Sequence, residues 1–433
     1  MKGFLKDKNT LKKCHIYRML LKSSREKHLS FHTPGHKIGK WDLTELSYTD
    51  NLSNPNGCIL EAEKDIAKIL RANRSFILTD GSTSGILSMF YALKKTGVTS
   101  VAIPLSSHKS VYNACSVFGI QPITFEIEKD EYGVENHIEF FDILGAIEKA
   151  GALFVTSPTY YGRVWEHAIF HKLKNSGKPI IVDGAHGGHL HYDRKLHPSD
   201  YADMWVDGVH KSLPALTHGA VVSAKDENFA KLLQEAVGIF RTTSPSYPIM
   251  ASVEYAVKYP KNEELEKSVF NFYRENSTRI KLYDDYTKLC VLYGKNAFET
   301  EKYFEKNGIY PEFCDGNIVM FYLSPATTKK QFETLKKYIV KSFPLFPCES
   351  VQLVPGSRIL ENFSENCGKE LIDLEDSVGR VCANTCGLFP PCTPLILTGE
   401  RITEEKMQLL KKADNTFGLE QNKISVFEEI RKE

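Results

Sequence analysis

The chain has 433 residues, which is enough for two or three domains that each bury a core. With 42% hydrophobic residues, 25% charged residues and a formal net charge of +1, it has the composition of a globular protein. The near-neutral charge argues against nucleic-acid and membrane partners, and no run reaches the roughly 18 apolar residues of a membrane helix. The charged start, MKGFLKDKNTLKKC, and ten cysteines without a CxxC pair predict a cytoplasmic protein with reduced thiols.

Helices and strands alternate along the first part of the chain. Residues 1–28 have apolar positions at mixed helical spacing, and we expect a helix within an N-terminal helical or extended segment over residues 1–50. Amphipathic stretches such as EAEKDIAKILRA then alternate with short apolar strands: SFILTDG, VAIP, ITFEI, ALFVTSP, PIIVDGA and MWVDGV. This alternation is typical of a mainly parallel α/β sheet covered by helices on both faces. We predict such a large domain over residues 51–275.

The pattern changes from about residue 290 onward. The stretches GIYPEFCDGNIVMFYLSP, KKQFETLKKYIVKSF and LFPPCTPLILTGERIT mix strand-like, helical and proline-rich sequence. They predict a smaller α+β domain over residues 276–433.

Polar segments follow five of the predicted strands: TDGSTSG, SSHKS, SPTYYG, DGAHGGH and DGVHKS. In an open parallel sheet, ligands bind beyond the carboxyl ends of the strands. The five segments therefore predict one site at that edge of the sheet.

The segment DGSTSG joins a strand to a helix N-terminus. Small residues leave its backbone N–H groups accessible, and the hydroxyls of Ser82, Thr83 and Ser84 add donors, as in a phosphate-binding turn. A simple helix cap is the alternative. Thr83 takes the serine position of a G-x-S-x-G nucleophile motif, which disfavours a serine hydrolase.

Two histidine-containing segments leave more than one interpretation open. Asp183 ends a buried strand, where a carboxylate needs a cationic partner such as a protonated ring nitrogen. A metal site built from Asp183 with His186, His189 and His191 is a rival interpretation, but an H-E-x-x-H motif is absent and we predict no metal. His108 suits either a helix cap or a stacking contact with a flat ring.

Lys211, in DGVHKSLPAL, is either a surface lysine at a turn or an amine placed for nucleophilic chemistry. A phosphate-binding turn, a ring-facing histidine, a buried aspartate and a reactive lysine are together the four contacts that pyridoxal 5'-phosphate (PLP) requires. The set favours a PLP site with Lys211 as its amine.

These motifs, together with FHTPGHKIG, DLTELSYTDNLSNPNG and FPPCTPLILTGERIT, resemble the Orn/Lys/Arg decarboxylases, group III of the PLP enzymes of fold type I, in their short bacterial form. The likeness implies a PLP-dependent transferase-like large domain and a smaller C-terminal domain. It also implies roles for single residues: a Schiff base with PLP for Lys211, contact with the pyridinium nitrogen for Asp183 and ring stacking for His108. Phosphate binding is implied for Ser82, Thr83 and Ser84, assisted by His210, with His186 beside the cofactor.

The expected reaction is decarboxylation of arginine, lysine or ornithine to a polyamine-type amine and CO₂. The resemblance also implies a homodimer with active sites at the subunit interface, to which FHTPGHKIG and TELSYTDN contribute. The distal cation of the substrate should meet carboxylates, and we considered Asp50, Glu45 and Glu400. Alternatives are another PLP-dependent lyase or aldolase reaction, and a PLP-binding protein without turnover.

The chain departs from the family pattern at two places. Gly208 stands where a serine or threonine is common, so one phosphate hydroxyl is expected to be missing. Phe389–Pro394 reads FPPCTP where relatives usually have YPPGIP, which leaves the identity of the substrate open.

Overall fold

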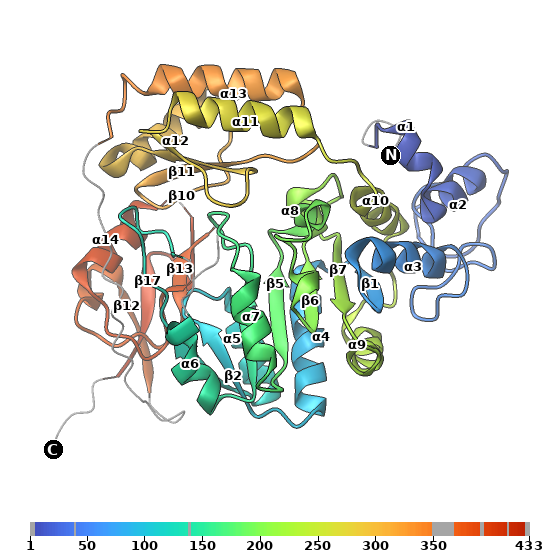
Figure 1. Cartoon of the computed structure of the whole chain (residues 1–433), viewed down its shortest axis with the longest axis horizontal. Coiled ribbons are helices and arrows are strands. Elements are labelled where there is room, and N and C mark those ends of the chain that lie inside the picture. Colours follow the sequence, from blue (N-terminus) through green and yellow to red (C-terminus); the bar gives the residue numbers. More distant parts are fainter. Residues whose placement is uncertain are drawn as a thin grey trace.

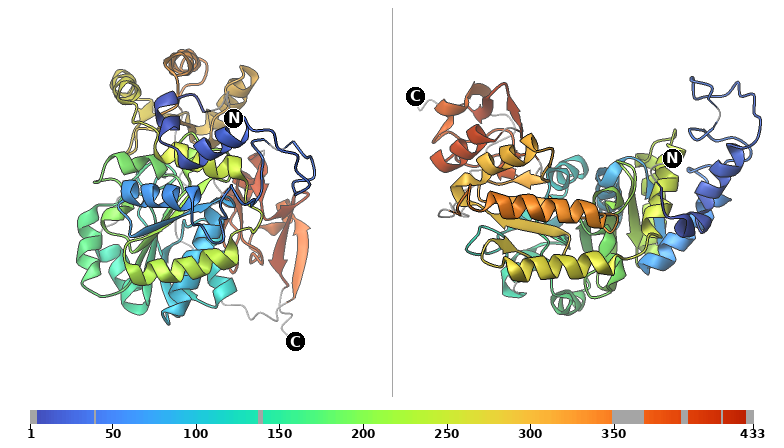
Figure 2. Two further views of the ribbon diagram at one scale, coloured as in Figure 1. Left: turned by 90° about the vertical axis from the view of Figure 1, so that its right-hand side faces the viewer. Right: turned by 90° about the horizontal axis from the view of Figure 1, so that it is seen from above.

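A computed structural model describes residues 5–38, 40–136, 140–348, 368–389, 394–413 and 415–428 of the chain. The helix expected over residues 1–28 is divided into α1 (Lys8–Lys12) and α2 (His15–Ser23). The break lies at Cys14, which has extended backbone angles. The chain then forms an arm that projects beyond one end of the molecule before it enters α3 (Cys58–Leu70), as the blue segment in Figure 2 shows.

The centre of the molecule is a seven-stranded sheet in the order β1-β7-β6-β5-β4-β2-β3 (Figure 1). β7 is antiparallel to both of its neighbours, and every other neighbouring pair is parallel. The mainly parallel α/β sheet that the sequence predicted is therefore confirmed. The strands are β1 (Arg74–Leu78), β2 (Ser100–Pro104), β3 (Gln121–Phe125), β4 (Ala152–Thr156), β5 (Ile180–Gly184), β6 (Met204–Asp207) and β7 (Ala220–Ala224).

Helices cover both faces of this sheet. One layer consists of α4 (Gly81–Lys95), α5 (Lys109–Phe118) and α9 (Glu227–Phe240), and the other contains α3, α6 (Phe140–Lys149), α7 (His167–Lys174) and α10 (Tyr247–Val257). Successive residues of a strand point to opposite faces, so Ile181 joins one core while Ile180 and Val182 join the other. Burial on both faces explains why the strand sequences are continuous apolar runs.

The C-terminal part forms two further cores. A four-stranded antiparallel sheet, β10-β11-β9-β8, packs against three helices, which lie at the top of Figure 1. The second core joins two three-stranded sheets, β12-β17-β16 and β14-β13-β15, with helix α14. The α+β character predicted for this region is confirmed, while the domain limits at residues 50 and 275 stay predictions.

The elements of the four-stranded unit are α11 (Glu263–Glu275), β8 (Ile280–Lys281), β9 (Lys288–Leu292), α12 (Ala297–Lys306), β10 (Phe313–Cys314), β11 (Ile318–Tyr322) and α13 (Lys329–Ser342). Those of the last unit are β12 (Lys369–Asp373), β13 (Cys386–Leu388), β14 (Pro394–Ile396), α14 (Glu404–Lys412), β15 (Thr416–Phe417), β16 (Leu419–Glu420) and β17 (Lys423–Phe427). Across the described ranges, no helix combines the length and the apolar character that crossing a bilayer requires.

Candidate active site

A cavity of about 890 Å³ opens at the carboxyl ends of the parallel strands. All five polar segments that the sequence singled out contribute to its lining, which includes Ser82, His108, Tyr160, Asp183 and Lys211. The four-stranded sheet closes one side through residues near β10, among them Phe313 and Asp315. The prediction that these segments meet at one edge of the sheet is confirmed.

The N-terminus of α4 faces the cavity. Gly81 has a positive φ of 79°, which turns the chain from β1 into the helix, and Gly85 packs so tightly on β6 that a Cβ there would lie 2.6 Å from Val206 Cγ2. Ser82 and Thr83 line the cavity, and the buried Ser82 Oγ has no hydrogen-bond partner in the described part of the chain. Ser84 Oγ instead donates to the Gly81 carbonyl (2.9 Å) and does not line the cavity.

Lys211 lies on the short helix α8 (Val209–Ser212), and its Nζ is 3.0 Å from Nε2 of His186. The His186 ring lies between Tyr160 and Tyr322, with centroid distances of 4.4 and 5.9 Å. Burial, together with the nearby charges of Lys211 and Lys288, holds the pKa of His186 well below its usual value. The imidazole is therefore neutral at pH 7, and its buried Nδ1 has no partner among the described residues.

Asp183 is buried near the end of β5, and its Oδ1 accepts a hydrogen bond from the Ala185 N–H (3.0 Å). Burial raises its pKa and nearby Asp207 adds to the rise, while the Ala185 N–H and Lys211 oppose it. A cationic partner would stabilise the charged form of a carboxylate in such a place, because burial otherwise makes that charge costly.

His108 and His210 also line the cavity. His108 caps α5 by accepting the Ser110 N–H at Nδ1 (3.2 Å), and burial together with Lys211 and Lys109 lowers its pKa to about 4. His210 Nδ1 donates to the Gly219 carbonyl (3.0 Å), and burial lowers its pKa as well. Both rings are therefore neutral and held in place by backbone groups.

The metal interpretation finds no support in the directions of the four side chains. His189 Nε2 donates to Asp285 (2.8 Å), and His191 Nδ1 donates to the Gly188 carbonyl (2.7 Å). His186 pairs with Lys211, and Asp183 with the Ala185 N–H. Among the described residues, no three of these four side chains bring ligand atoms close enough together to hold a metal ion.

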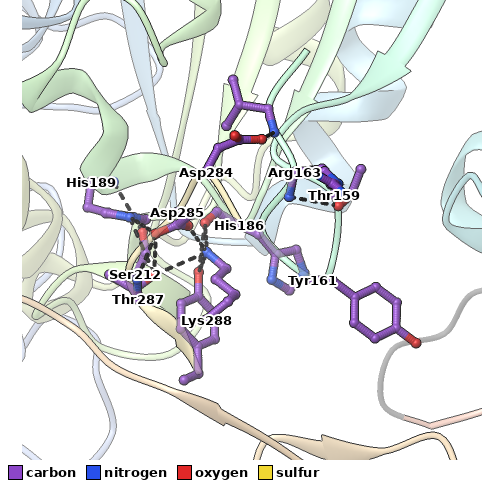
Figure 3. Close-up of polar contacts among 12 residues, drawn as sticks. Thr159, Tyr161, Arg163, His186, His189, Ser212, Asp284, Asp285, Thr287 and Lys288 are labelled. Carbon is purple, nitrogen blue, oxygen red and sulfur yellow. Dashed lines mark hydrogen bonds and ion pairs between the residues drawn. The ribbon is translucent and has the colours of Figure 1, made fainter. Parts of the chain in front are cut away.

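Sequence reasoning missed a buried polar network behind the cavity (Figure 3). It joins Asp285, Thr287 and Lys288, at the start of β9, to Tyr322 at the end of β11 and to the His186 loop. In the sequence, YDDYTKLCVLYG resembles a solvated loop that leads into a strand, and nothing in it signals burial of Asp285 and Lys288.

None of the carboxylates first considered for the distal cation lines the cavity. Asp50 accepts backbone N–H groups of Gly57 and Ile59 at the start of α3, and Glu400 pairs with Lys406. Acidic side chains nevertheless outnumber lysines in the lining by seven to three. The acidic residues are Asp80, Glu126, Glu128, Asp130, Glu135, Asp183 and Asp315.

Comparison with known families gives this site its context. The family model for the major domain of Orn/Lys/Arg decarboxylases matches residues 14–281. The chain belongs to the Orn/Lys/Arg decarboxylase family. It is thus an enzyme of a decarboxylase family, as its motifs predicted.

Individual relatives match most of the chain. It is 27% identical over 456 residues to the Bacillus subtilis protein YaaO, covering 92% of this chain and 93% of that protein. It is 25% identical over 455 residues to the arginine decarboxylase of Bacillus subtilis, with coverage of 92% and 93%. The solved structure of Escherichia coli constitutive lysine decarboxylase has the same fold, with a TM-score of 0.76 and 18% identity, over 96% of this chain and 82% of that one.

Two departures from the decarboxylase family pattern can be placed in the structure. A Cβ at Gly208 would lie 2.4 Å from the Ala185 carbonyl oxygen and 2.9 Å from Ser82 Oγ. The position thus has no room for the serine or threonine that is common there. In FPPCTP, residues 390–393 lie outside the described residues, whereas Phe389 is exposed and Pro394 lines the cavity.

Proposed function

We propose that the chain catalyses PLP-dependent decarboxylation of a basic amino acid (arginine, lysine or ornithine) to the corresponding amine and CO₂. The observation that carries the proposal is the placement of Lys211 in one cavity with Asp183, His108 and the α4 N-terminus. Relatives named arginine decarboxylase, and a fold shared with lysine decarboxylases, support the same reaction.

The cavity residues fit PLP. Buried polar groups normally have hydrogen-bond partners, so the orphan Ser82 Oγ and His186 Nδ1 indicate a polar ligand. The N-terminus of α4 suits a phosphate dianion, since its first N–H groups have no partner within the helix. Asp183 supplies the buried carboxylate that a protonated ring nitrogen would complement. We exclude Ser84 from this set because its hydroxyl is used within the helix.

In this assignment Lys211 holds the aldehyde carbon, Asp183 the ring nitrogen and His108 one face of the ring. When bound, PLP supplies an electron sink for the electron pair that remains at Cα as the carboxylate departs. Asp183 would stabilise positive charge on the ring nitrogen, because burial leaves its carboxylate poorly hydrated. Neutral His186 accepts the hydrogen bond of the Lys211 amine without adding a second positive charge.

Lys211 is also the residue to which we assign return of the proton to Cα. Its Nζ faces the cavity and has His186 as a neighbour that can orient it. His210, anchored to the Gly219 carbonyl, is the second candidate for this proton. Tyr160, Tyr161 and Phe313 form an aromatic side of the cavity.

The acidic lining supports a basic substrate. Asp315, at the Tyr161 and Phe313 side, accepts hydrogen bonds from the Tyr161 hydroxyl (2.7 Å) and from the backbone N–H groups of Asn317 (2.8 Å) and Ile318 (2.7 Å), and burial raises its pKa. A substrate ammonium or guanidinium at that side would meet a carboxylate in a poorly hydrated place, where the attraction is strong.

We further propose that the enzyme works as a homodimer. The arm after α2 exposes Leu29 (87%), Phe31 (87%) and Ile38 (64%), which are large apolar side chains that a partner subunit would cover. A cytoplasmic location and a role in polyamine biosynthesis stay predictions.

Product analysis tests the reaction. The protein is incubated with PLP and a panel of amino acids, and the products are identified by mass spectrometry. An amine that lacks only the carboxylate of arginine, lysine or ornithine supports the proposal. A product formed by cleavage of another bond at Cα or Cβ would show that the enzyme is a lyase or aldolase of another kind and would contradict the decarboxylase proposal. Bound PLP without exchange of the Cα hydrogen for any amino acid would indicate a protein without turnover.

A further inference from the structure

A buried ion pair ties the four-stranded sheet to the loop that carries His186. The side chains of Lys288 and Asp285 both expose 0% of their surface. Lys288 Nζ donates to the His186 carbonyl oxygen (2.7 Å) and to the Tyr322 hydroxyl (2.9 Å). Tyr322 donates its own hydroxyl hydrogen to the same carbonyl (2.7 Å). Two strands, β9 and β11, thus hold one main-chain oxygen of the cavity loop, and Figure 3 shows Lys288 beside His186.

The other end of the pair reaches the helix of Lys211. Asp285 accepts hydrogen bonds from His189 Nε2 (2.8 Å) and Thr287 Oγ1 (2.7 Å). The His189 backbone N–H in turn donates to Oγ of Ser212, the residue next to Lys211 (3.2 Å). The network therefore joins the His186 loop, β9, β11 and α8 in one continuous set of contacts.

Electrostatics favours the charged form of Asp285 in this network. Burial alone would raise the pKa of Asp285, but His189 and Lys288 hold it well below its usual value. Burial lowers the pKa of Lys288, and Asp285 opposes that change. A fully buried ion pair adds little net stability compared with a well-packed apolar pair, because both ions lose their hydration. A gain in stability therefore does not account for the pair.

The loop itself explains why external contacts are needed. His186 is followed by Gly187 and Gly188, and adjacent glycines restrict a backbone least. One turn hydrogen bond, from the Gly187 N–H to the Gly184 carbonyl (2.7 Å), holds the loop internally, and contacts from outside the loop add to it in fixing the His186 ring 3.0 Å from Lys211 Nζ.

We propose that Lys288 and Tyr322 are positioning residues for the Lys211–His186 pair. Their hydrogen bonds fix the position of the His186 carbonyl oxygen. Because the side chain is attached to the same residue, this also fixes the imidazole beside the Lys211 amine. The meaning of this arrangement for catalysis rests on the proposed function, but its structural effect can be measured without cofactor.

Two variants and one control test the proposal. Tyr322→Phe removes one donor and keeps the ring that stacks on His186. Lys288→Met combined with Asp285→Asn removes both charges and leaves neither ion alone. The matched control is Glu254→Gln with Lys258→Met, which neutralises a buried i,i+4 ion pair at the C-terminal end of α10 whose residues do not line the cavity.

The first readout is the rate at which diethyl pyrocarbonate modifies His186 in cofactor-free protein, followed by peptide mass spectrometry. The second is the dissociation constant for PLP. Loss of one hydrogen bond should increase the open population of the loop, so Tyr322→Phe is expected to raise the modification rate and weaken PLP binding about five-fold. The charge-neutral double variant should show a larger change, and the control should leave His186 at the wild-type rate.

Two results overturn the proposal. One is a wild-type modification rate of His186 in both Tyr322→Phe and the double variant. The other is an equal acceleration in the control, which would show that general loss of stability causes the effect. Wild-type protein that fails to bind PLP would refute the proposed function instead, and the His186 rates would still decide the positioning role.

Discussion

A methyl group at position 208 is expected to damage the site, although relatives commonly have a larger residue there. The backbone angles of Gly208 (φ −82°, ψ 71°) are open to any residue, so the cost of Gly208→Ala is steric. The new Cβ would lie 2.4 Å from the Ala185 oxygen, about 1 Å short of the 3.4 Å at which ordinary contact begins. Ala185 carries the N–H that binds Asp183, so a shift of this segment reaches the proposed ring-nitrogen contact.

Overpacking of this kind typically costs about 1–3 kcal/mol, which corresponds to roughly 5- to 150-fold weaker PLP binding if the strain is relieved by moving the site. Differential scanning calorimetry and PLP titration measure the two effects. Gly238→Ala, on the exposed side of α9 with open space around its Cβ, is the matched control and should be neutral or slightly stabilising. The reasoning is refuted if Gly208→Ser keeps wild-type stability and binds PLP as tightly as Gly208 or more tightly.

Three further predictions follow from the site. Burial lowers the pKa values of His108 and His191 to about 4. Protonation of these histidines therefore favours the unfolded chain. The free energy of unfolding should fall between about pH 6.5 and pH 4 by up to about 3 kcal/mol for each histidine. Thermal melts recorded at several pH values measure this loss. The variant His108→Asn, which keeps a capping side chain, should lessen it. An unchanged dependence of stability on pH in this variant would contradict the lowered pKa of His108. Asp183→Asn should lower kcat/KM at least about ten-fold, since a hydrogen bond to a charged group is lost, and wild-type kinetics would argue against its contact with the ring nitrogen. L-arginine should be used or bound at least about ten-fold better than uncharged L-citrulline, given the acidic lining; equal KM values would mean that this lining does not select charge.

Local sequence patterns were sufficient to predict the sheet and the edge at which the polar segments meet. Strand runs such as PIIVDGA and MWVDGV are continuous apolar segments because both faces of the sheet are buried, and their polar ends necessarily meet at one edge. Lys211 and His108 follow strands and Asp183 lies near the end of one, so their convergence at one edge was predictable from chain order.

What the sequence could not show depends on contacts between distant segments. Lys288 reaches His186 across 102 residues, and no local pattern records that a lysine before a strand is fully buried. Asp50 was a reasonable candidate for the substrate cation, yet its carboxylate is occupied by the N–H groups that begin α3. The crowding at Gly208 likewise arises from the packing of α8 against the end of β5, which only the structure reveals.

The central claim is that Lys211 is the amine that binds PLP. The most direct measurement is borohydride reduction of the PLP-loaded protein, followed by peptide mapping of the added phosphopyridoxyl mass. The account predicts that the mass appears on the peptide containing Lys211 and that Lys211→Ala protein carries none. Modification at another lysine, or none in the wild-type protein, would contradict it.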